Sequence, residues 1–110
     1  AMTKNDDLAY AAQRLSKMPE VPVIDDNGIL KGAFTKDVLC KCVADGVTPK
    51  TKISKDAIKL QPIQMCACVS SNDAATDIIE TFRTHNLATM YVTNDGTPAG
   101  KYIGTIIDAF

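Results

Sequence analysis

The sequence predicts an α/β domain. Short β-branched runs alternate with amphipathic stretches of helical period, and the order of these segments is repeated along the chain. The chain has 110 residues, of which 45% are hydrophobic, so it can form one compact unit with its own core.

Charge and hydropathy argue against several classes of function. The 12 basic and 13 acidic side chains give a net charge of −1, so no basic excess indicates direct binding of nucleic acid. No apolar run reaches the roughly 18 residues of a membrane span, and the polar N-terminus does not look like a signal peptide. We therefore expect no membrane insertion and a cytoplasmic location.

Residues 21–39, VPVIDDNGILKGAFTKDVL, hold the clearest local signals. A β-branched run is followed by an Asp-Asn-Gly turn, whose residues tolerate the positive φ of tight hairpins, and then by a second apolar run. Gly32 in this second strand indicates a close approach of other backbone, and Thr35 is the expected N-cap of a helix over residues 36–45. Such a junction leaves backbone N–H groups at the end of a sheet, which favours an anion. The side chains of this helix that are expected to face the core are Val38, Leu39, Cys42 and Val43.

The other elements follow from the same signals. They are a helix over residues 6–17 that Asn5 caps, a solvated connector over 46–53, one or two helical turns over 54–58, strands over 65–69, 89–93 and 101–107, and a turn over 94–100. A second long helix begins at residues 70–73 and ends near 86, and it is expected to bury Ala74, Ala75, Ile78, Ile79 and Phe82.

The same order of elements occurs twice along the chain. Residues 21–28 match residues 89–96 without a gap, so that Val21 corresponds to Thr89 and Pro22 to Met90. Each copy reads strand–helix–strand–strand–helix (βαββα), with the copies divided at 1–48 and 49–110. The first strand of copy one is expected to be short, and the final helix of copy two to be incomplete. Because neither unit buries its sheet alone, we expect the two to pack sheet against sheet.

The four cysteines form two C-x-C pairs, Cys40 with Cys42 and Cys66 with Cys68. This spacing does not suit a structural zinc site, which usually takes two to four intervening residues. We expect buried or half-buried thiols, with a redox sensor built on Cys66 and Cys68 as an alternative. His85 is expected to complement the end of its helix. No nucleophile with a base stands out, so an enzyme is not expected.

The order and spacing of these motifs resemble a tandem pair of CBS domains, the regulatory repeats named for cystathionine β-synthase. The resemblance rests on the helix over residues 6–17 and on the VPVID, DNG and LKGAFTKDVL motifs, and it covers nearly the whole chain. It implies two βαββα repeats with pseudo-two-fold symmetry, a homodimer and no catalysis. It further implies a regulatory (Bateman) module that requires no cofactor, binds an adenosine-containing ligand such as AMP, ADP, ATP or S-adenosylmethionine, and modulates a tethered effector domain.

The family's ligand motif maps onto the first copy. Gly32 and Thr35 match its glycine and hydroxyl residue, and Asp37 stands near its ribose-binding acid, after one intervening residue instead of two. Lys36 is the nearest candidate for a phosphate contact, and Val21 and Pro22 would wall the adenine. Without a ligand, Thr35 and Asp37 would serve only to cap the helix and complement its dipole.

The second copy departs from the motif. Gly104 matches, but Ile107 takes the hydroxyl position, and Ala109 or Phe110 takes the acid position. Thr89 and Met90 could still shape a second site. We therefore expect at most one competent nucleotide site, and a ligand-free dimerisation or docking element is the alternative function.

Overall fold

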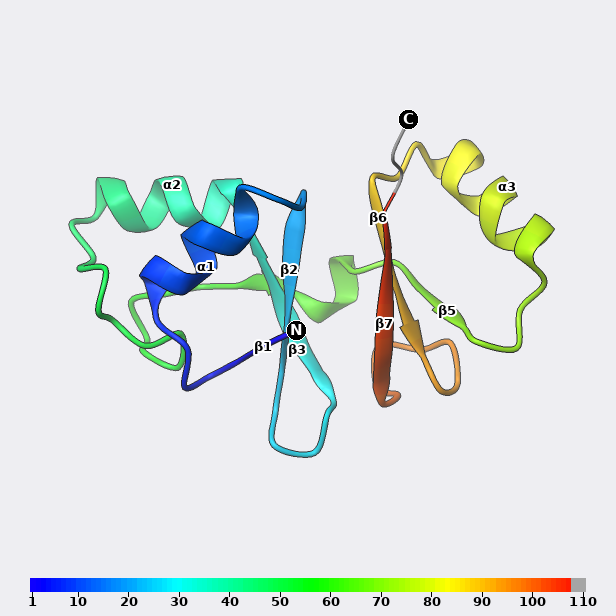
Figure 1. The fold of residues 1–110 in the computed structure, drawn as a ribbon, viewed down its shortest axis with the longest axis horizontal. Helices are drawn as coiled ribbons and strands as arrows, with labels where there is room; N and C mark the ends of the chain where they lie inside the picture. The colour runs from blue at the N-terminus through cyan, green and yellow to red at the C-terminus, as the bar shows by residue number, and fades with distance from the viewer. Residues whose placement is uncertain (108–110) are drawn as a thin grey trace.

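A computed structural model describes residues 1–107 as two β-sheets that lie side by side, with helices on their outer sides (Figure 1). The first sheet has the strand order β1-β2-β3-β4, and the second has the order β5-β6-β7. This arrangement confirms the α/β fold of two sheets. The elements are β1 (Met2–Thr3), α1 (Leu8–Leu15), β2 (Glu20–Ile24), β3 (Leu30–Thr35), α2 (Lys36–Ala44), β4 (Gln61–Pro62), a 3-10 turn η1 (Ile63–Met65), β5 (Cys68–Ser70), α3 (Ala75–His85), β6 (Thr89–Thr93) and β7 (Tyr102–Ile107).

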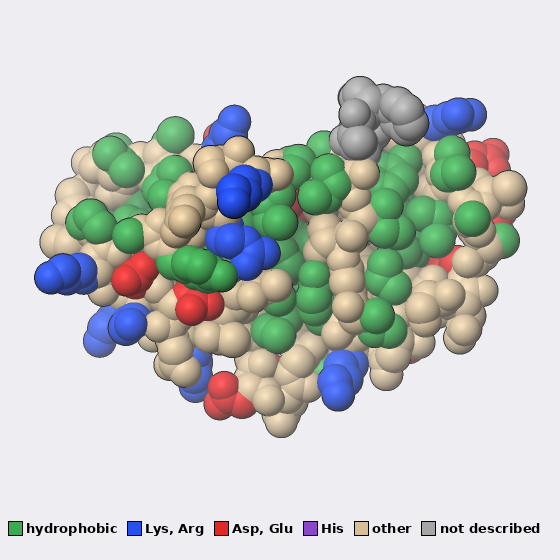
Figure 2. Space-filling view, viewed as in Figure 1, with side chains coloured by type: hydrophobic (Ala, Val, Ile, Leu, Met, Phe, Trp, Pro, Cys, Tyr) green, Lys and Arg blue, Asp and Glu red, His purple; other side chains and the backbone are tan. Residues whose placement is uncertain are grey.

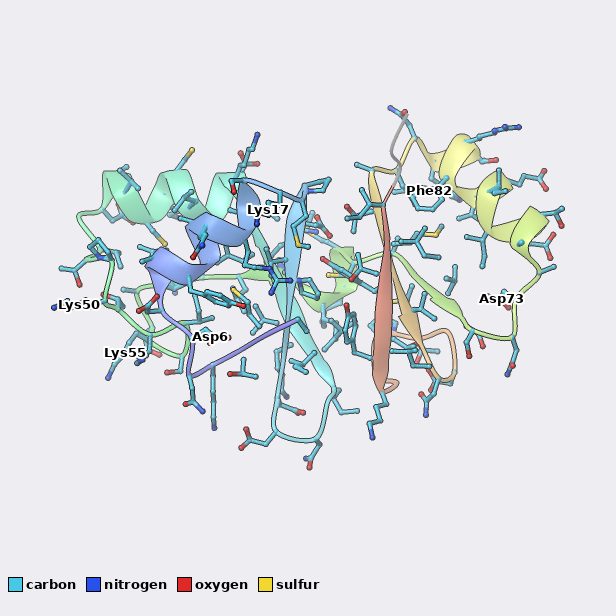
Figure 3. The ribbon with its side chains drawn as sticks, in the orientation of Figure 1. Asp6, Lys17, Lys50, Lys55, Asp73 and Phe82 are labelled. Carbon is cyan, nitrogen blue, oxygen red and sulfur yellow. The ribbon has the colours of Figure 1, made fainter. Side chains whose placement is uncertain are left out.

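The two halves repeat the same strand pairings. β1 runs parallel to β2 and β5 runs parallel to β6, whereas β2–β3 and β6–β7 are antiparallel hairpins. Both hairpins change register near the turn, between Val23 and Ile24 and between Val92 and Thr93. Asp6 and Asp73, labelled in Figure 3, accept hydrogen bonds from the backbone of the preceding strand at 3.0 and 2.9 Å. The internal repeat that the sequence indicates is therefore present in three dimensions.

The pairing corrects the expected alignment of the copies by one residue. Val23 pairs with Gly32, and Val92 pairs with Gly104, so Val21 corresponds to Met90 and not to Thr89. The counterpart of Thr89 is Glu20. The ungapped match was wrong because it placed Thr93 opposite Asp25. In the structure Asn94 is the equivalent of Asp25, because each exchanges hydrogen bonds with the backbone of the residue that begins the return strand, Lys101 and Ile29 respectively.

The halves meet on a pseudo-two-fold axis at the hairpin tips. Ile29 and Lys101, which occupy equivalent positions, form an isolated antiparallel bridge, and Tyr102 N donates to Gly28 O at 2.8 Å. Between the sheets lies a buried cluster of Leu30, Ala33, Cys66 and Tyr91. Tyr91 also packs edge-on against Tyr102, with ring centroids 6.3 Å apart. The predicted sheet-to-sheet packing is therefore the observed one.

A second core lies between the first sheet and its two helices. Its largest members are Met2, Leu8, Leu15 and Phe34, and the segment after α2 contributes Ile53 and Ile58. The strand β4 then pairs with the outer edge of β3. The division at residues 48 and 49 stays a prediction, and residues 53–62 lie against the first half.

Gly32 confirms the expected close approach of backbone. A Cβ at this position would lie 2.6 Å from the carbonyl oxygen of Gln61. Only a glycine therefore allows β4 to pair with β3 here.

Several local predictions were wrong. The N-cap of α1 is Asp7, because Asp6 is engaged with Thr3 and the helix begins two residues later than expected. Residues 54–58 form successive turns, held by the burial of Ile53 and Ile58. A 3-10 turn over residues 63–65 takes the first residue of the strand expected over 65–69. Strand β5 begins only at Cys68.

Helix burial also differs from the predicted pattern. Val43 on α2 is 66% exposed and Ile79 on α3 is 51% exposed, and Ala74 and Ala75 are exposed as well. Phe82, labelled in Figure 3, lies on the side of α3 that faces the sheet. The exposure of Ile79 follows from the position of α3, which has no other described helix beside it, whereas α1 and α2 contact each other.

Candidate functional site

The predicted site residues of the first copy gather where β3 ends and α2 begins. We call this place the β3–α2 junction and define it by Glu20, Pro22, Ala33, Thr35 and the first turn of α2. Glu20 pairs with Thr35, and Pro22 pairs with Ala33, in the antiparallel ladder. Directly opposite residues project to the same face, and here that face is turned toward the second sheet, because Ala33 belongs to the cluster between the sheets.

The alternation of side chains separates the two predicted adenine-wall residues. Pro22 lies on the junction face and is fully buried. Val21 is also fully buried, but it packs in the other core, beneath α1 and α2. Only the backbone of Val21 therefore remains to contact a ligand at the junction.

Thr35 is the N-cap of α2, as predicted. Its backbone is extended, and its hydroxyl accepts a hydrogen bond from Val38 N at 3.3 Å. The N–H groups of Lys36 and Asp37 take part in no turn, loop or cap hydrogen bond among residues 1–107. By contrast, the loop after α2 occupies the first turn of α1, where Leu8 N donates to Thr51 O and Ala9 N donates to Pro49 O.

The side chains of Lys36 and Asp37 are exposed. Asp37 lies in the first turn of α2, where its charge complements the positive end of the helix dipole. Neither side chain takes part in an ion pair among the described residues. Among the described residues, no ion pair therefore holds either side chain away from a ligand.

The sequence reasoning missed two residues of the junction, Glu20 and Tyr91. Tyr91 OH donates to Glu20 Oε1 at 2.6 Å, which joins residues 71 positions apart and belonging to different copies. Burial raises the pKa of the Tyr91 phenol, and the Glu20 carboxylate raises it further. The sequence places a charged residue, Glu20, at the start of an apolar strand, but nothing in it indicates a partner 71 residues away.

The equivalent place in the second copy is uncharged. Thr89 takes the position of Glu20 and pairs with Ile107, which takes the position of Thr35. Thr89 is 8% exposed, and its hydroxyl has no hydrogen-bond partner within residues 1–107. The pseudo-two-fold relation explains this, because the counterpart of Tyr91 is Pro22, which has no polar side-chain atom. Met90, the other predicted residue, is 1% exposed.

In the second copy, Ala109 or Phe110 was expected at the position of the ribose-binding acid. Both residues lie outside the described part of the chain.

Burial disfavours the thiolate form of three of the cysteines. Burial raises the pKa of Cys66 to about 11, and the Glu20 carboxylate and Cys68 add to that effect. Burial likewise raises the pKa of Cys68 and of Cys42. A thiol that stays protonated at neutral pH is a weak nucleophile. Cys40 is exposed, contrary to the expectation that the thiols are buried or half-buried.

Two recesses of the described surface lie away from the junction. One follows α3 past Asp77, Glu80, Thr81, Thr84 and His85, and the other lies between α2 and residues 57–59. Residues 1–107 contain no cluster of three or more His, Cys, Asp or Glu side chains placed to hold a metal ion. None of their helices combines the length and apolar character that crossing a membrane requires.

The fold is shared with solved structures. Hypoxic Response Protein I, solved with two coordinated zinc ions, matches with a TM-score of 0.67 and 19% identity over 99% of this chain and 84% of its own. The CBS domain pair of protein MJ0100, solved with 5-methylthioadenosine and S-adenosyl-L-methionine, matches with a TM-score of 0.62 and 19% identity over 96% and 80%.

The CBS domains of a transcriptional regulator from Streptococcus pneumoniae match with a TM-score of 0.66 and 14% identity over 96% of this chain and 80% of that chain. No protein-family model matches the sequence, and no curated protein does. The likeness to known proteins is therefore one of fold. Two βαββ units that pack sheet to sheet about a pseudo-two-fold axis, together with these likenesses, show that the chain has the fold of a CBS domain pair.

Proposed function

We propose that the chain is a non-catalytic regulatory module that binds an adenosine-containing ligand at the β3–α2 junction. The candidate ligands are AMP, ADP, ATP and S-adenosylmethionine, and the solved relative with bound S-adenosyl-L-methionine supports this class. The observation that carries the proposal is the open first turn of α2, where Thr35 supplies a hydroxyl and Asp37 a carboxylate beside the boundary between the copies.

Each group at the junction has a part to play in such binding. A carboxylate accepts hydrogen bonds from both hydroxyls of a ribose, which is the role of Asp37. The ring of Pro22 lies on the junction face but is fully buried, so a base would contact it only after the packing between the copies rearranges. Lys36 is exposed at the start of α2 and is the candidate for contact with an anionic group. At the second copy, the unpartnered hydroxyl of Thr89 and the side chain of Met90 would shape any further contact.

The junction lies between the two copies, which suggests how binding is transmitted. Glu20 at the junction is bonded to Tyr91 of the second copy. A ligand that changes this contact alters the packing of the copies and, through it, a tethered effector domain. Such a ligand acts by favouring one arrangement over another, so it must bind the two arrangements with different affinities. A cytoplasmic homodimer is part of this proposal.

A thermal-shift experiment tests the proposal. A ligand at a hundred times its dissociation constant adds about 2.7 kcal/mol of stability, which raises the melting temperature of a domain of this size by roughly 10 °C or more. We expect that shift in the wild type with one of the four ligands and its loss in Asp37→Asn. Asp45→Asn, which changes the same charge at the other end of α2, is the matched control and should keep the shift.

The result that would contradict the site is a shift that survives Asp37→Asn at full size. The absence of a shift with all four ligands would contradict the function itself.

A second candidate, a ligand-free docking element, is favoured by the apolar surface of the second half. Ile103 is 55% exposed on the strand β7, and Ile79 is 51% exposed on α3. The outer edge of β7 has no partner strand within residues 1–107, whereas β4 covers that of β3. Figure 2 shows apolar side chains gathered over the middle of the molecule and around β6 and β7. Concentration-dependent association that Ile103→Lys abolishes would support this function.

A further inference from the structure

Glu20 is a half-buried carboxylate that lacks a cationic partner. The ion pairs within residues 1–107 join Lys4 to Asp26 and Lys31 to Asp25, and neither involves Glu20. Its Oε1 accepts the hydrogen bond from Tyr91 OH, and no hydrogen bond to its Oε2 is formed by the described residues. Withdrawing a carboxylate from water without a countercharge costs free energy. An uncharged residue at position 20 would avoid this cost, so the charge is not explained by packing.

The position of Glu20 places its charge beside the ligand motif. Glu20 and Thr35 are directly opposite in the ladder, so their Cβ atoms lie about 4.5–5.5 Å apart and project to one face. Tyr91 fixes one oxygen on the side of the second copy. The carboxylate is therefore next to the Thr35 hydroxyl, where a group that faces the first turn of α2 would lie.

The charges at this place do not suit a phosphate. At the first turn of α2, the carboxylates of Glu20 and Asp37 accompany the ammonium of Lys36. The N-terminal end of a helix contributes only about half a positive charge. At a partly solvated surface, repulsion between the Glu20 carboxylate and a nearby phosphate weakens binding by about tenfold. A phosphate would therefore meet net repulsion where the bare helix end would attract it.

We propose that Glu20 determines the ligand specificity of the β3–α2 junction, by selecting adenosine derivatives that are uncharged or cationic beside the ribose over those that carry a phosphate. This inference rests on the proposed function and narrows its ligands. Glu20 Oε2 accepts a hydrogen bond from a hydroxyl or ammonium donor of the ligand, and Tyr91 positions the carboxylate. Thr89, at the equivalent place in the second copy, carries no charge and exerts no such selection.

Isothermal titration calorimetry with adenosine and AMP tests this inference on three proteins. The wild type should bind adenosine about tenfold more tightly than AMP. Glu20→Gln removes the charge and keeps an oxygen that accepts from Tyr91, so it should fold normally and bring the two affinities within about threefold. Glu80→Gln, which removes an exposed charge on α3, is the matched control and should retain the wild-type ratio.

The outcomes separate the inference from the function on which it rests. If adenosine binds and the ratio of the two affinities is the same in the wild type and in Glu20→Gln, Glu20 is not the specificity determinant, while the junction remains a nucleoside site. If AMP binds the wild type as tightly as adenosine does, the inference is also overturned. If neither compound binds any of the three proteins, the inference is overturned, whereas the proposed function is decided separately by the thermal-shift experiment with all four candidate ligands.

Discussion

Replacing Tyr91 with phenylalanine removes one hydroxyl from the boundary between the copies and leaves the aromatic ring in place. The ring keeps its apolar burial and its edge-on contact with Tyr102, so the change isolates the 2.6 Å hydrogen bond to Glu20. A hydrogen bond to a charged group contributes about 1.5–3 kcal/mol, and because Glu20 is only half-buried we expect the lower end, about 1.5 kcal/mol. Urea denaturation of wild type and Tyr91→Phe measures this difference in the free energy of unfolding.

The second tyrosine of the cluster provides the matched control for this prediction. Tyr102 OH is bonded to the Thr105 hydroxyl at 2.6 Å, which is a contact between neutral groups within one strand. Tyr102→Phe should cost less, about 0.5–1 kcal/mol. If Tyr91→Phe costs no more than Tyr102→Phe, the bond between the copies does not stabilise their packing and the reasoning is refuted. A double-mutant cycle with Glu20→Gln should show coupling, because the two side chains share one contact.

The same hydroxyl makes a prediction about alkaline pH. The pKa of Tyr91 in the folded protein is raised above the value of about 10 in the unfolded chain. The protonated Tyr91 hydroxyl therefore contributes fully to the free energy of unfolding below about pH 10. This contribution is lost as the pH rises toward the pKa of Tyr91 in the folded protein, at up to about 1.4 kcal/mol per pH unit for one proton. The raised thiol pKa values act in the same direction from about pH 9. Above pH 10, the stability of the wild type should fall more steeply than that of Tyr91→Phe, and equal slopes would contradict this.

Three further predictions follow from differences between the copies. Ala74→Asp should stabilise the protein by about 1 kcal/mol in urea denaturation. The reason is that Ala74 at the N-cap of α3 has no side chain to accept a hydrogen bond, whereas the carboxylate of Asp7 caps α1. No gain in stability would contradict the equivalence of the two helix starts. Gly32→Ala should cost about 1–3 kcal/mol because its Cβ would meet backbone, whereas Gly104→Ala, whose Cβ would meet nothing within 4 Å, should be nearly neutral; similar costs would contradict the close approach of β4. Because Cys40 is exposed and the pKa of Cys66 is raised to about 11, a thiol reagent followed by peptide mass spectrometry should modify Cys40 first. Faster modification of Cys66 would contradict this order and support the redox-sensor alternative.

Local signals in the sequence were sufficient where a few adjacent residues determine the structure. The hairpin over residues 20–35 depends on a β-branched run and a turn with Gly28 at φ 79°. The N-cap Thr35 depends only on neighbouring backbone. These features were predicted correctly because capping and turn chemistry act over three or four residues.

Features that depend on distant partners were not visible in the sequence. The strand β4 is only two residues long and forms because its backbone reaches the edge of β3. The alignment of the copies failed by one residue because the position that closes the turn is set by hydrogen bonds across the hairpin. Glu20 was missed at the site for the same reason, since its partner Tyr91 is 71 residues away.

Helical periodicity identified α3 but overstated its burial. The pattern predicts which side chains share a face, and Phe82 and Ile78 are indeed half-buried. It does not say how much of that face the neighbouring elements cover, so Ile79 was predicted to be buried and is 51% exposed. Periodicity is therefore evidence for a helix and weaker evidence for its environment.

The most direct test of the central claim is a titration of ¹⁵N-labelled protein with adenosine, followed by amide chemical shifts. If an adenosine ligand binds at the β3–α2 junction, the largest changes should fall on the amides of Gly32, Thr35 and Asp37, with a smaller change at Tyr91 across the boundary. Changes confined to the recess along α3, or no change at millimolar adenosine, would contradict the claim.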